Sequence, residues 1–258
     1  MIIIAACNND QVLKANLLAS DDVAAGRITV LPQRGFKCAG MAYNTGLKQT
    51  VAPIVAFVHQ DVYLPIGWLG RVMSQIAELE KKDPNWAVIG VWGICPDGRY
   101  SGRVWCTGGG REHVGQITET TEAASIDEIV IIVNNRHQLS FDESLPGYHL
   151  YATDIIRTAR SKGLRSYIIT APVVHNSRKN PRPLDKHYFA AYRYMQRKWS
   201  AELPLLTAVV PVTRTGWPLY RQWAKNEYNI IRGRRRFGGQ DEDAIAIARQ
   251  LGYESRAV

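Results

Sequence analysis

The segment AFVHQDVYLPIGW contains the side chains whose type and position say most about chemistry. The apolar run Ile54–Val58 has the pattern of a buried strand and passes directly into His59, Gln60 and Asp61. Open α/β sheets place ligand-binding groups at the carboxyl ends of their strands, so the Asp61 carboxylate is well positioned to bind a divalent cation. A carboxylate after a strand can equally be a turn residue or a helix cap.

Apolar strands that alternate with amphipathic helices surround this segment and must position it. The pattern predicts strands at residues 2–6, 27–31, 54–58, 86–92, 129–133 and 167–171, and helices after Asp10, which can cap the first of them, after Gly67 and over 153–162. This order predicts an α/β fold with a mostly parallel sheet flanked by helices. Residues 96–115 hold six glycines, which indicates a hairpin or a mobile loop.

The C-terminal part of the chain has a helical pattern. An aromatic stripe at helical spacing follows Asp185, and it is typical of a core-facing helix surface. Further helices are expected at 218–232 and 240–251. We therefore expect one α/β domain over residues 1–200 and a helical C-terminal extension over residues 201–258.

The composition limits the class of protein. The 258 residues include 32 basic and 23 acidic side chains, and the net charge of +9 favours an anionic partner such as a nucleotide, a phosphorylated lipid, a membrane surface or nucleic acid. The four cysteines have no C-x-x-C spacing, which argues against a zinc site and a disulfide scaffold. With no signal peptide or membrane span expected, we predict a cytoplasmic protein.

Several common enzyme classes lack their motifs here. The glycine-rich stretch 106–111 does not end in Gly-Lys-Ser/Thr, and no strand leads into G-x-G-x-x-G. A P-loop ATPase and a Rossmann dehydrogenase therefore lose support. There is no G-x-S-x-G elbow for a serine hydrolase.

Three longer segments together resemble a known family. AYNTGLKQTVAPIVAFVHQDVYLPIGWL, SFDESLPGYHLYATDIIRTARSKG and APVVHNS, in this order, resemble the family 2 glycosyltransferases of the GT-A fold. The resemblance spans residues 1–200. It implies transfer of a sugar, with inversion, from a nucleoside-diphosphate sugar, expected to be a UDP-sugar, to a carbohydrate or lipid-linked acceptor hydroxyl, as in polysaccharide biosynthesis.

The resemblance also implies a metal site. Asp61 takes the place of the last acidic residue of the family's D-x-D element, while His59 stands where many relatives have the first, so the chain reads HQD. His175 resembles the family's second protein ligand. The implied cofactor is Mn²⁺ or Mg²⁺, which would neutralise the diphosphate leaving group as a Lewis acid.

The implied general base is Asp154, at the start of the helix beginning near Thr153, with His149 as the alternative. The acceptor hydroxyl needs such a base because its own pKa is far above 7. The family's acidic pair is reduced here to Ala152-Thr153-Asp154. An Asp in a first helical turn can instead simply stabilise the helix dipole.

Nucleotide contacts are expected from side chains at three places. The first strand and its turn offer a thiol and two amides, a helix start offers another amide, and the HQD segment offers an imidazole and an amide. In chain order these six residues are Cys7, Asn8, Asn9, Asn44, His59 and Gln60. The acidic pairs 127–128 and 142–143 could face the acceptor or form solvated turns.

Two alternatives to an active transferase remain open at this stage. The HQD variant and Ala152 also fit a catalytically silent module that binds a sugar nucleotide. The basic run of Arg232, Arg234, Arg235 and Arg236 could contact nucleic acid or an anionic membrane. No recognisable DNA- or RNA-binding motif accompanies it, so no nucleic acid is expected as a partner.

Overall fold

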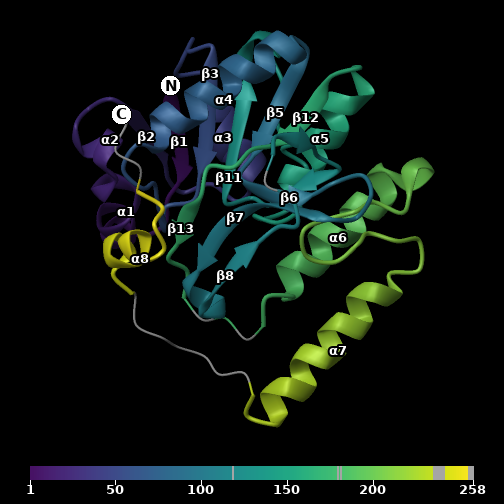
Figure 1. Cartoon of the computed structure of the whole chain (residues 1–258). Coiled ribbons are helices and arrows are strands. Elements are labelled where there is room, and N and C mark those ends of the chain that lie inside the picture. Colours follow the sequence, from purple (N-terminus) through teal and green to yellow (C-terminus); the bar gives the residue numbers. More distant parts are fainter. Residues whose placement is uncertain (118, 179, 181, 235–241, 255–258) are drawn as a thin grey trace.

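The structure is a computed structural model that describes residues 1–117, 119–178, 180, 182–234 and 242–254 (Figure 1). The helices are α1 (Asp10–Ala15), α2 (Asp21–Ala24), α3 (Ala39–Leu47), α4 (Trp68–Lys82), α5 (Tyr151–Ser161), α6 (Lys186–Lys198), α7 (Trp217–Ile231) and α8 (Ala244–Gln250). The strands are β1 (Ile2–Ala6), β2 (Thr29–Gln33), β3 (Ile54–Val58), β4 (Val62–Tyr63), β5 (Trp86–Gly90), β6 (Trp92–Ile94), β7 (Tyr100–Cys106), β8 (Arg111–Val114), β9 (Thr121–Glu122), β10 (Ser125–Ile126), β11 (Val130–Asn134), β12 (Arg165–Ile168) and β13 (Val173–His175).

A central sheet with helices on both faces confirms the predicted α/β class (Figure 1). Among the described residues it has seven strands in the order β2-β1-β3-β11-β5-β12-β9. Side chains of β3 alternate between the layers: Val55 and Phe57 join the core under α3 and α5, while Ala56 and Val58 join the core under α1 and α4. Period-two alternation with both faces covered explains why this strand reads as a continuous apolar run.

One central strand runs against the expected direction. β11 is antiparallel to both of its neighbours, β3 and β5, whereas β1 pairs in parallel with β2 and β3. A strand buried on both faces has the same apolar pattern in either direction, so the sequence did not distinguish the two.

A second, smaller sheet lies beside the end of the central one and was not expected as a unit. It has the strand path β10-β6-β7-β13-β4, with β8 paired to β7. Of the two alternatives for residues 96–115, the hairpin is confirmed, because β7 and β8 are antiparallel neighbours. The predicted strand 86–92 is divided between the two sheets, since β5 ends just before Val91 and β6 begins just after it.

Local signals explain how the helices begin and pack. Asn9, not Asp10, caps α1: its side chain accepts hydrogen bonds from the backbone N–H groups of Gln11 and Val12. In α3, Gly46 lies so close to β1 that an added Cβ would be 2.5 Å from the Ile4 side chain. The glycine of the Asn-x-Gly pattern therefore lets α3 lie against the sheet.

The C-terminal part is helical, as expected. Asp185 caps α6, because its side chain accepts from two backbone N–H groups, and Tyr188 and Tyr192 of this helix pack into the main core. Figure 1 shows α7 outside α6, remote from the central sheet, and α8 back against the sheet region near α1. The predicted helix 240–251 is observed as α8, and positions 240 and 241 lie outside the described residues.

In the described part of the chain, every helix is too short or too polar to cross a bilayer.

Candidate metal centre and active site

A short antiparallel pairing brings Asp61 to His175. β3 ends at Val58, and the chain returns as β4, where Val62 pairs with His175 of β13. The Asp61 carbonyl accepts from the Asn176 backbone N–H at 2.8 Å, which fixes the two segments together. As a result, His175 Nε2 lies 3.4 Å from Asp61 Oδ1.

His59 completes a cluster of three groups that could hold a metal ion. One ligand atom from each of His59, Asp61 and His175 lies within 4.8 Å of the others. His59 Nε2 is 2.9 Å from the Tyr151 hydroxyl, and this hydrogen bond holds the imidazole ring in place. The sequence interpretation treated His59 only as a nucleotide contact at the first position of the D-x-D element.

Burial and charge set the protonation of the cluster. Burial alone would raise the pKa of Asp61, but the charge of His175 and its hydrogen bond outweigh burial and hold that pKa well below its usual range. Burial would lower the pKa of His175, but the same carboxylate raises it well above 6.5. For His59, burial dominates and lowers the pKa. These directions favour an ion pair of a charged Asp61 carboxylate and a charged His175 imidazolium, next to a His59 ring that burial keeps neutral.

The donor set fits a divalent first-row cation. It offers one carboxylate oxygen and two imidazole nitrogens, and a hydrogen bond to the Tyr151 hydroxyl holds the His59 ring. Imidazole ligands favour Mn²⁺ over Mg²⁺, which prefers oxygen ligands alone.

A cavity of about 540 Å³ opens on the Asp61 side of the cluster. We call it the β1–β3 cavity, and it is lined by Ala6, Cys7, Asn8, Asp10, Arg34, Gly35, Phe36, Tyr43, His59, Gln60, Asp61 and Tyr148. It offers the rings of Phe36 and Tyr148 and the guanidinium of Arg34, which pairs with exposed Asp10 at 2.5 Å.

A second cavity, of about 680 Å³, opens on the His175 side. We call it the hairpin cavity, and its lining comes mainly from β6, β7, β8 and the chain before β11: Trp92, Tyr100, Val104, Cys106, Arg111, Glu112, His113, Val114, Gln116, Asp127, Ile129, His175, Ala208 and Val209. The lining includes Asp127, for which the sequence left two roles open, a contact to the acceptor or a place in a solvated turn. The candidate metal ligands therefore lie between two cavities.

Four of the expected nucleotide contacts, Cys7, Asn8, His59 and Gln60, line the β1–β3 cavity, whereas Asn9 does not. Gln60 Oε1 accepts from the backbone N–H groups of Asn8 and Asn9 at 3.1 and 3.0 Å, and Gln60 Nε2 donates to Asn8 Oδ1 at 2.6 Å. The Cys7 thiol points to Asp10 Oδ1 at 3.6 Å. Gln60 thus ties the end of β3 to the turn after β1.

Asn44 lies away from this cavity. Its side-chain oxygen accepts from the Phe141 backbone N–H, and its nitrogen donates to the Phe141 carbonyl and to Glu143 Oε1, each at 2.9 Å. Asn44 therefore attaches the F-D-E segment to α3, and it lines a different cavity on that side of the molecule.

Asp154 and His149, the expected bases, line neither of the two cavities. Asp154 is 2% exposed, and its carboxylate accepts from Lys198 Nζ and, at 2.8 Å, from the Trp199 indole nitrogen. Burial raises its pKa despite the Lys198 charge. His149 packs against the Tyr188 ring, with Nε2 3.9 Å from Asp185 Oδ1, at the start of α6.

Two residues next to the cluster were not singled out from the sequence. Tyr151 supports His59, and its hydroxyl also lies 3.4 Å from that of Tyr43. Cys106 Sγ lies 4.0 Å from His175 Nδ1, and His175 lowers the pKa of this thiol against the opposing effect of burial. Both reach the cluster through tertiary contacts, and no spacing in the sequence signals them.

Comparison with known proteins finds similarity in solved structures alone. No family model matches the chain, and no curated protein sequence matches it. A mannosyltransferase from Pyrobaculum calidifontis, in complex with GDP-Man and Mn²⁺, aligns with 97% of this chain and 78% of its own at 13% identity and a TM-score of 0.46.

Two further glycosyltransferase structures are similar to the same degree. GalNAc-T7 with UDP, GalNAc and Mn²⁺ aligns with 98% of this chain at 12% identity and a TM-score of 0.45, and this chain spans about half (51%) of it. TarS 1-349 of S. aureus gives 78% coverage of this chain, 66% of its own, 15% identity and a TM-score of 0.47. At these identities, the function has to be inferred from the site itself.

Proposed function

We propose that this protein is a metal-dependent glycosyltransferase that moves a sugar from a nucleoside-diphosphate sugar to an acceptor hydroxyl with inversion. The observation that carries the proposal is the cluster of His59, Asp61 and His175, because His59 and Asp61 line one cavity and His175 lines another. A two-substrate transfer needs a donor space and an acceptor space that meet at the leaving group.

The donor belongs in the β1–β3 cavity. Phe36 and Tyr148 supply apolar ring surface for a nucleoside, and the guanidinium of Arg34 supplies positive charge and planar donors for a phosphate. Asn8 and Gln60 line the same cavity as Asp61, and their contacts to the nucleotide, together with that of the neighbouring Asn9, remain part of the proposal.

His59, Asp61 and His175 would hold the metal. When bound, Mn²⁺ or Mg²⁺ supplies Lewis-acid stabilisation of the negative charge that grows on the departing diphosphate. Tyr151 orients the His59 ring, and Asp61 supplies the negative charge of the protein ligand set.

The acceptor belongs in the hairpin cavity, and there we propose Asp127 as the general base. The acceptor oxygen attacks the anomeric carbon as the bond to the diphosphate oxygen breaks on the opposite face, and the hydroxyl proton passes to the Asp127 carboxylate. One displacement of this kind inverts the anomeric centre. Asp154 and His149 remain the alternatives that the resemblance implies.

Donor turnover tests the proposal. With a panel of UDP- and GDP-sugars, product should form with Mn²⁺ and stop with a chelator, and Asp61→Ala should reduce turnover about 100-fold or more. Asp97→Asn, which changes an exposed carboxylate that lines neither cavity, is the matched control. Full turnover by Asp61→Ala would contradict the proposal, while donor binding without turnover across acceptors would favour the silent module.

The identity of the substrates stays a prediction. UDP-sugars are the first donors to test, with carbohydrate and lipid-linked acceptors. A cytoplasmic location and a part in polysaccharide biosynthesis rest on the sequence expectations alone.

A further inference from the structure

The outer face of α7 exposes large apolar side chains in one stripe. Trp217 is 67% exposed, Tyr228 50% and Ile231 82%. Together with Tyr220 and Ala224, they follow the three- and four-residue spacing of a single helix face. We call this stripe the α7 face. Exposed apolar surface of this kind marks an interaction site, and Trp and Tyr are the residues that concentrate at membrane–water interfaces.

Positive charge borders this face. Arg221, Lys225 and Arg232 lie along one flank of α7, and Arg232 stacks over the Tyr228 ring at 5.4 Å. Among the described residues, none of the three forms an ion pair with a carboxylate, and the one acidic residue of α7, Glu227, is paired with Arg182.

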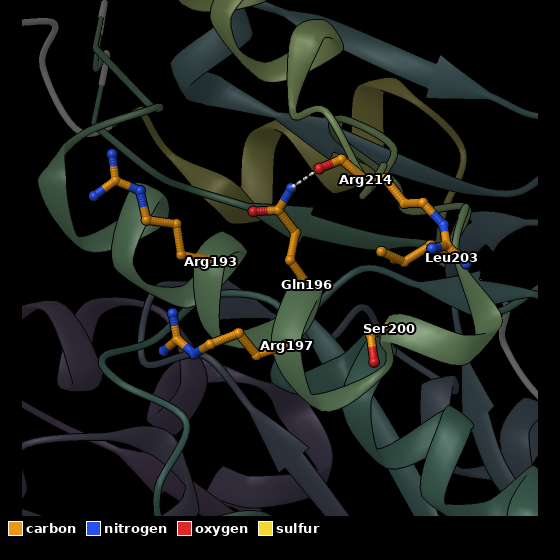
Figure 2. A pocket seen from close by; sticks show the side chains of 6 residues that line it. All are labelled: Arg193, Gln196, Arg197, Ser200, Leu203 and Arg214. Carbon is orange, nitrogen blue, oxygen red and sulfur yellow. Dashed lines mark hydrogen bonds between the residues drawn. The ribbon is translucent and has the colours of Figure 1, made fainter.

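An arginine-rich pocket adjoins the start of α7. It has a volume of about 720 Å³ and is lined by Arg193, Gln196, Arg197, Ser200, Leu203 and Arg214. Figure 2 shows the guanidinium groups of Arg193 and Arg197 on one side of Gln196 and the Arg214 side chain on the other. Gln196 Nε2 donates to the carbonyls of Thr213 and Arg214 at 2.6 and 3.2 Å, which joins the pocket to the turn before α7.

This pocket has the chemistry of an anion site. Within the described chain, no carboxylate lines the pocket or pairs with its three arginines. Guanidinium groups bind phosphate oxygens through planar, paired donors. The pocket and the α7 face therefore offer phosphate-binding and apolar groups on neighbouring parts of α6 and α7.

We propose that the α7 face and the arginine pocket together form a docking surface for a membrane that contains anionic phospholipids. The aromatic and aliphatic side chains enter the interfacial region, and Arg193, Arg197 and Arg214 bind headgroup phosphates. The sequence interpretation placed a membrane contact in the basic run after α7, of which Arg235 and Arg236 lie outside the described residues.

A second copy of this chain fits the surface less well. In a two-fold dimer, the same surface meets itself, so unpaired arginines and lysines of one copy would face those of the other. Cores of protein interfaces are depleted of charged residues, whereas an anionic membrane complements them.

Vesicle flotation tests the proposal without reference to any activity. The full-length protein should float with vesicles of phosphatidylcholine and phosphatidylglycerol and stay below with phosphatidylcholine alone. Arg193→Gln/Arg197→Gln/Arg214→Gln and Trp217→Ser/Tyr228→Ser/Ile231→Ser should each weaken binding about tenfold or more. Val51→Ser removes an apolar side chain that is 98% exposed elsewhere, and it should bind like the wild type.

Three results would overturn the proposal. These are absence of flotation with anionic vesicles, flotation that neither variant weakens, and a concentration-dependent dimer in sedimentation that the α7 variant turns into a monomer. The last result would assign the face to a subunit interface. Circular dichroism melts of all variants confirm that each is folded.

Discussion

Asp61 and His175 are the central residues of the proposed active site, and neighbouring groups set their charge and orientation. The two side chains form an ion pair, because each partner shifts the pKa of the other toward the charged form. His59 is neutral and is held by Tyr151. The fold thus brings three candidate ligand atoms close together, and a single substitution at Tyr151 can remove the hydrogen bond that holds the His59 ring.

Tyr151→Phe should therefore weaken metal binding without removing a ligand. Loss of the hydroxyl frees the His59 ring, and the Mn²⁺ concentration for half-maximal turnover should rise about tenfold or more. Tyr167→Phe, which loses a hydrogen bond to Asp83 on another side of the sheet, is the matched control. An unchanged Mn²⁺ requirement in Tyr151→Phe would mean that the hydroxyl does not support a metal ligand.

The identity of the general base can be separated from the stability of the fold. Asp127→Asn should lower kcat about 100-fold or more with little change in Tm, because its carboxylate lines the hairpin cavity. Asp154→Asn should instead cost about 1–3 kcal/mol of unfolding free energy, because it weakens a buried contact to Lys198 and Trp199. If Asp154→Asn loses kcat while Asp127→Asn keeps it, the base is Asp154.

Glu128 should make stability depend on pH. Burial, and next the charge of Asp127, raise the pKa of Glu128 from 4.5 to about 8. Between these values the unfolded chain has released the proton while the folded protein still keeps it, so the free energy of unfolding falls as pH rises. Glu128→Gln should therefore stabilise the protein at pH 8 relative to pH 5 by about 1 kcal/mol or more.

Urea melts at the two pH values measure this difference. Glu122→Gln, which removes an exposed carboxylate from β9, controls for the change in net charge. The same change in unfolding free energy at both pH values for Glu128→Gln would show that this carboxyl is not held protonated.

At the scale of the elements, α3 packs closely against β1. Substitutions of two helix glycines, Gly46 in α3 and Gly70 in α4, test this packing. Gly46→Ala would place a Cβ 2.5 Å from Ile4, and overpacking of this kind costs about 1–3 kcal/mol. Gly70→Ala, in α4, meets no atom within 4 Å and should stabilise the protein by about 0.5–1 kcal/mol, since Ala is the better helix former. Thermal melts of both variants should move in opposite directions, and a stabilised Gly46→Ala would contradict the packing.

The sequence predicted well those elements whose hydrophobic pattern is clear. β1, β3 and α4 follow from uninterrupted apolar runs and from helical periodicity, and their bounds agree with the structure within a residue or two. The direction of β11 and the smaller sheet were missed, because short strands and strand direction depend on tertiary pairing. The cap of α1 was assigned to Asp10, where two adjacent residues could both serve, and Asn9 is the cap.

At the scale of the whole molecule, the site is assembled from segments far apart in the chain. The sequence predicted that Asp61 and His175 belong together, and the structure brings them within 3.4 Å. It offered no signal for Tyr151, for Cys106 or for the two cavities, since these depend on contacts between segments far apart in the chain. α7 and the arginine pocket add a second surface, whose proposed role in membrane docking is independent of catalysis.

Binding of Mn²⁺, measured by electron paramagnetic resonance with UDP or GDP present, tests the central claim most directly. The wild-type protein should bind one Mn²⁺ per chain, and Asp61→Asn and His175→Gln should each weaken that binding about tenfold or more. His137→Gln, which changes a histidine that contacts the Trp86 carbonyl, should bind like the wild type. If Asp61→Asn and His175→Gln both bind Mn²⁺ as the wild type does, the cluster is not the metal site and the account is contradicted.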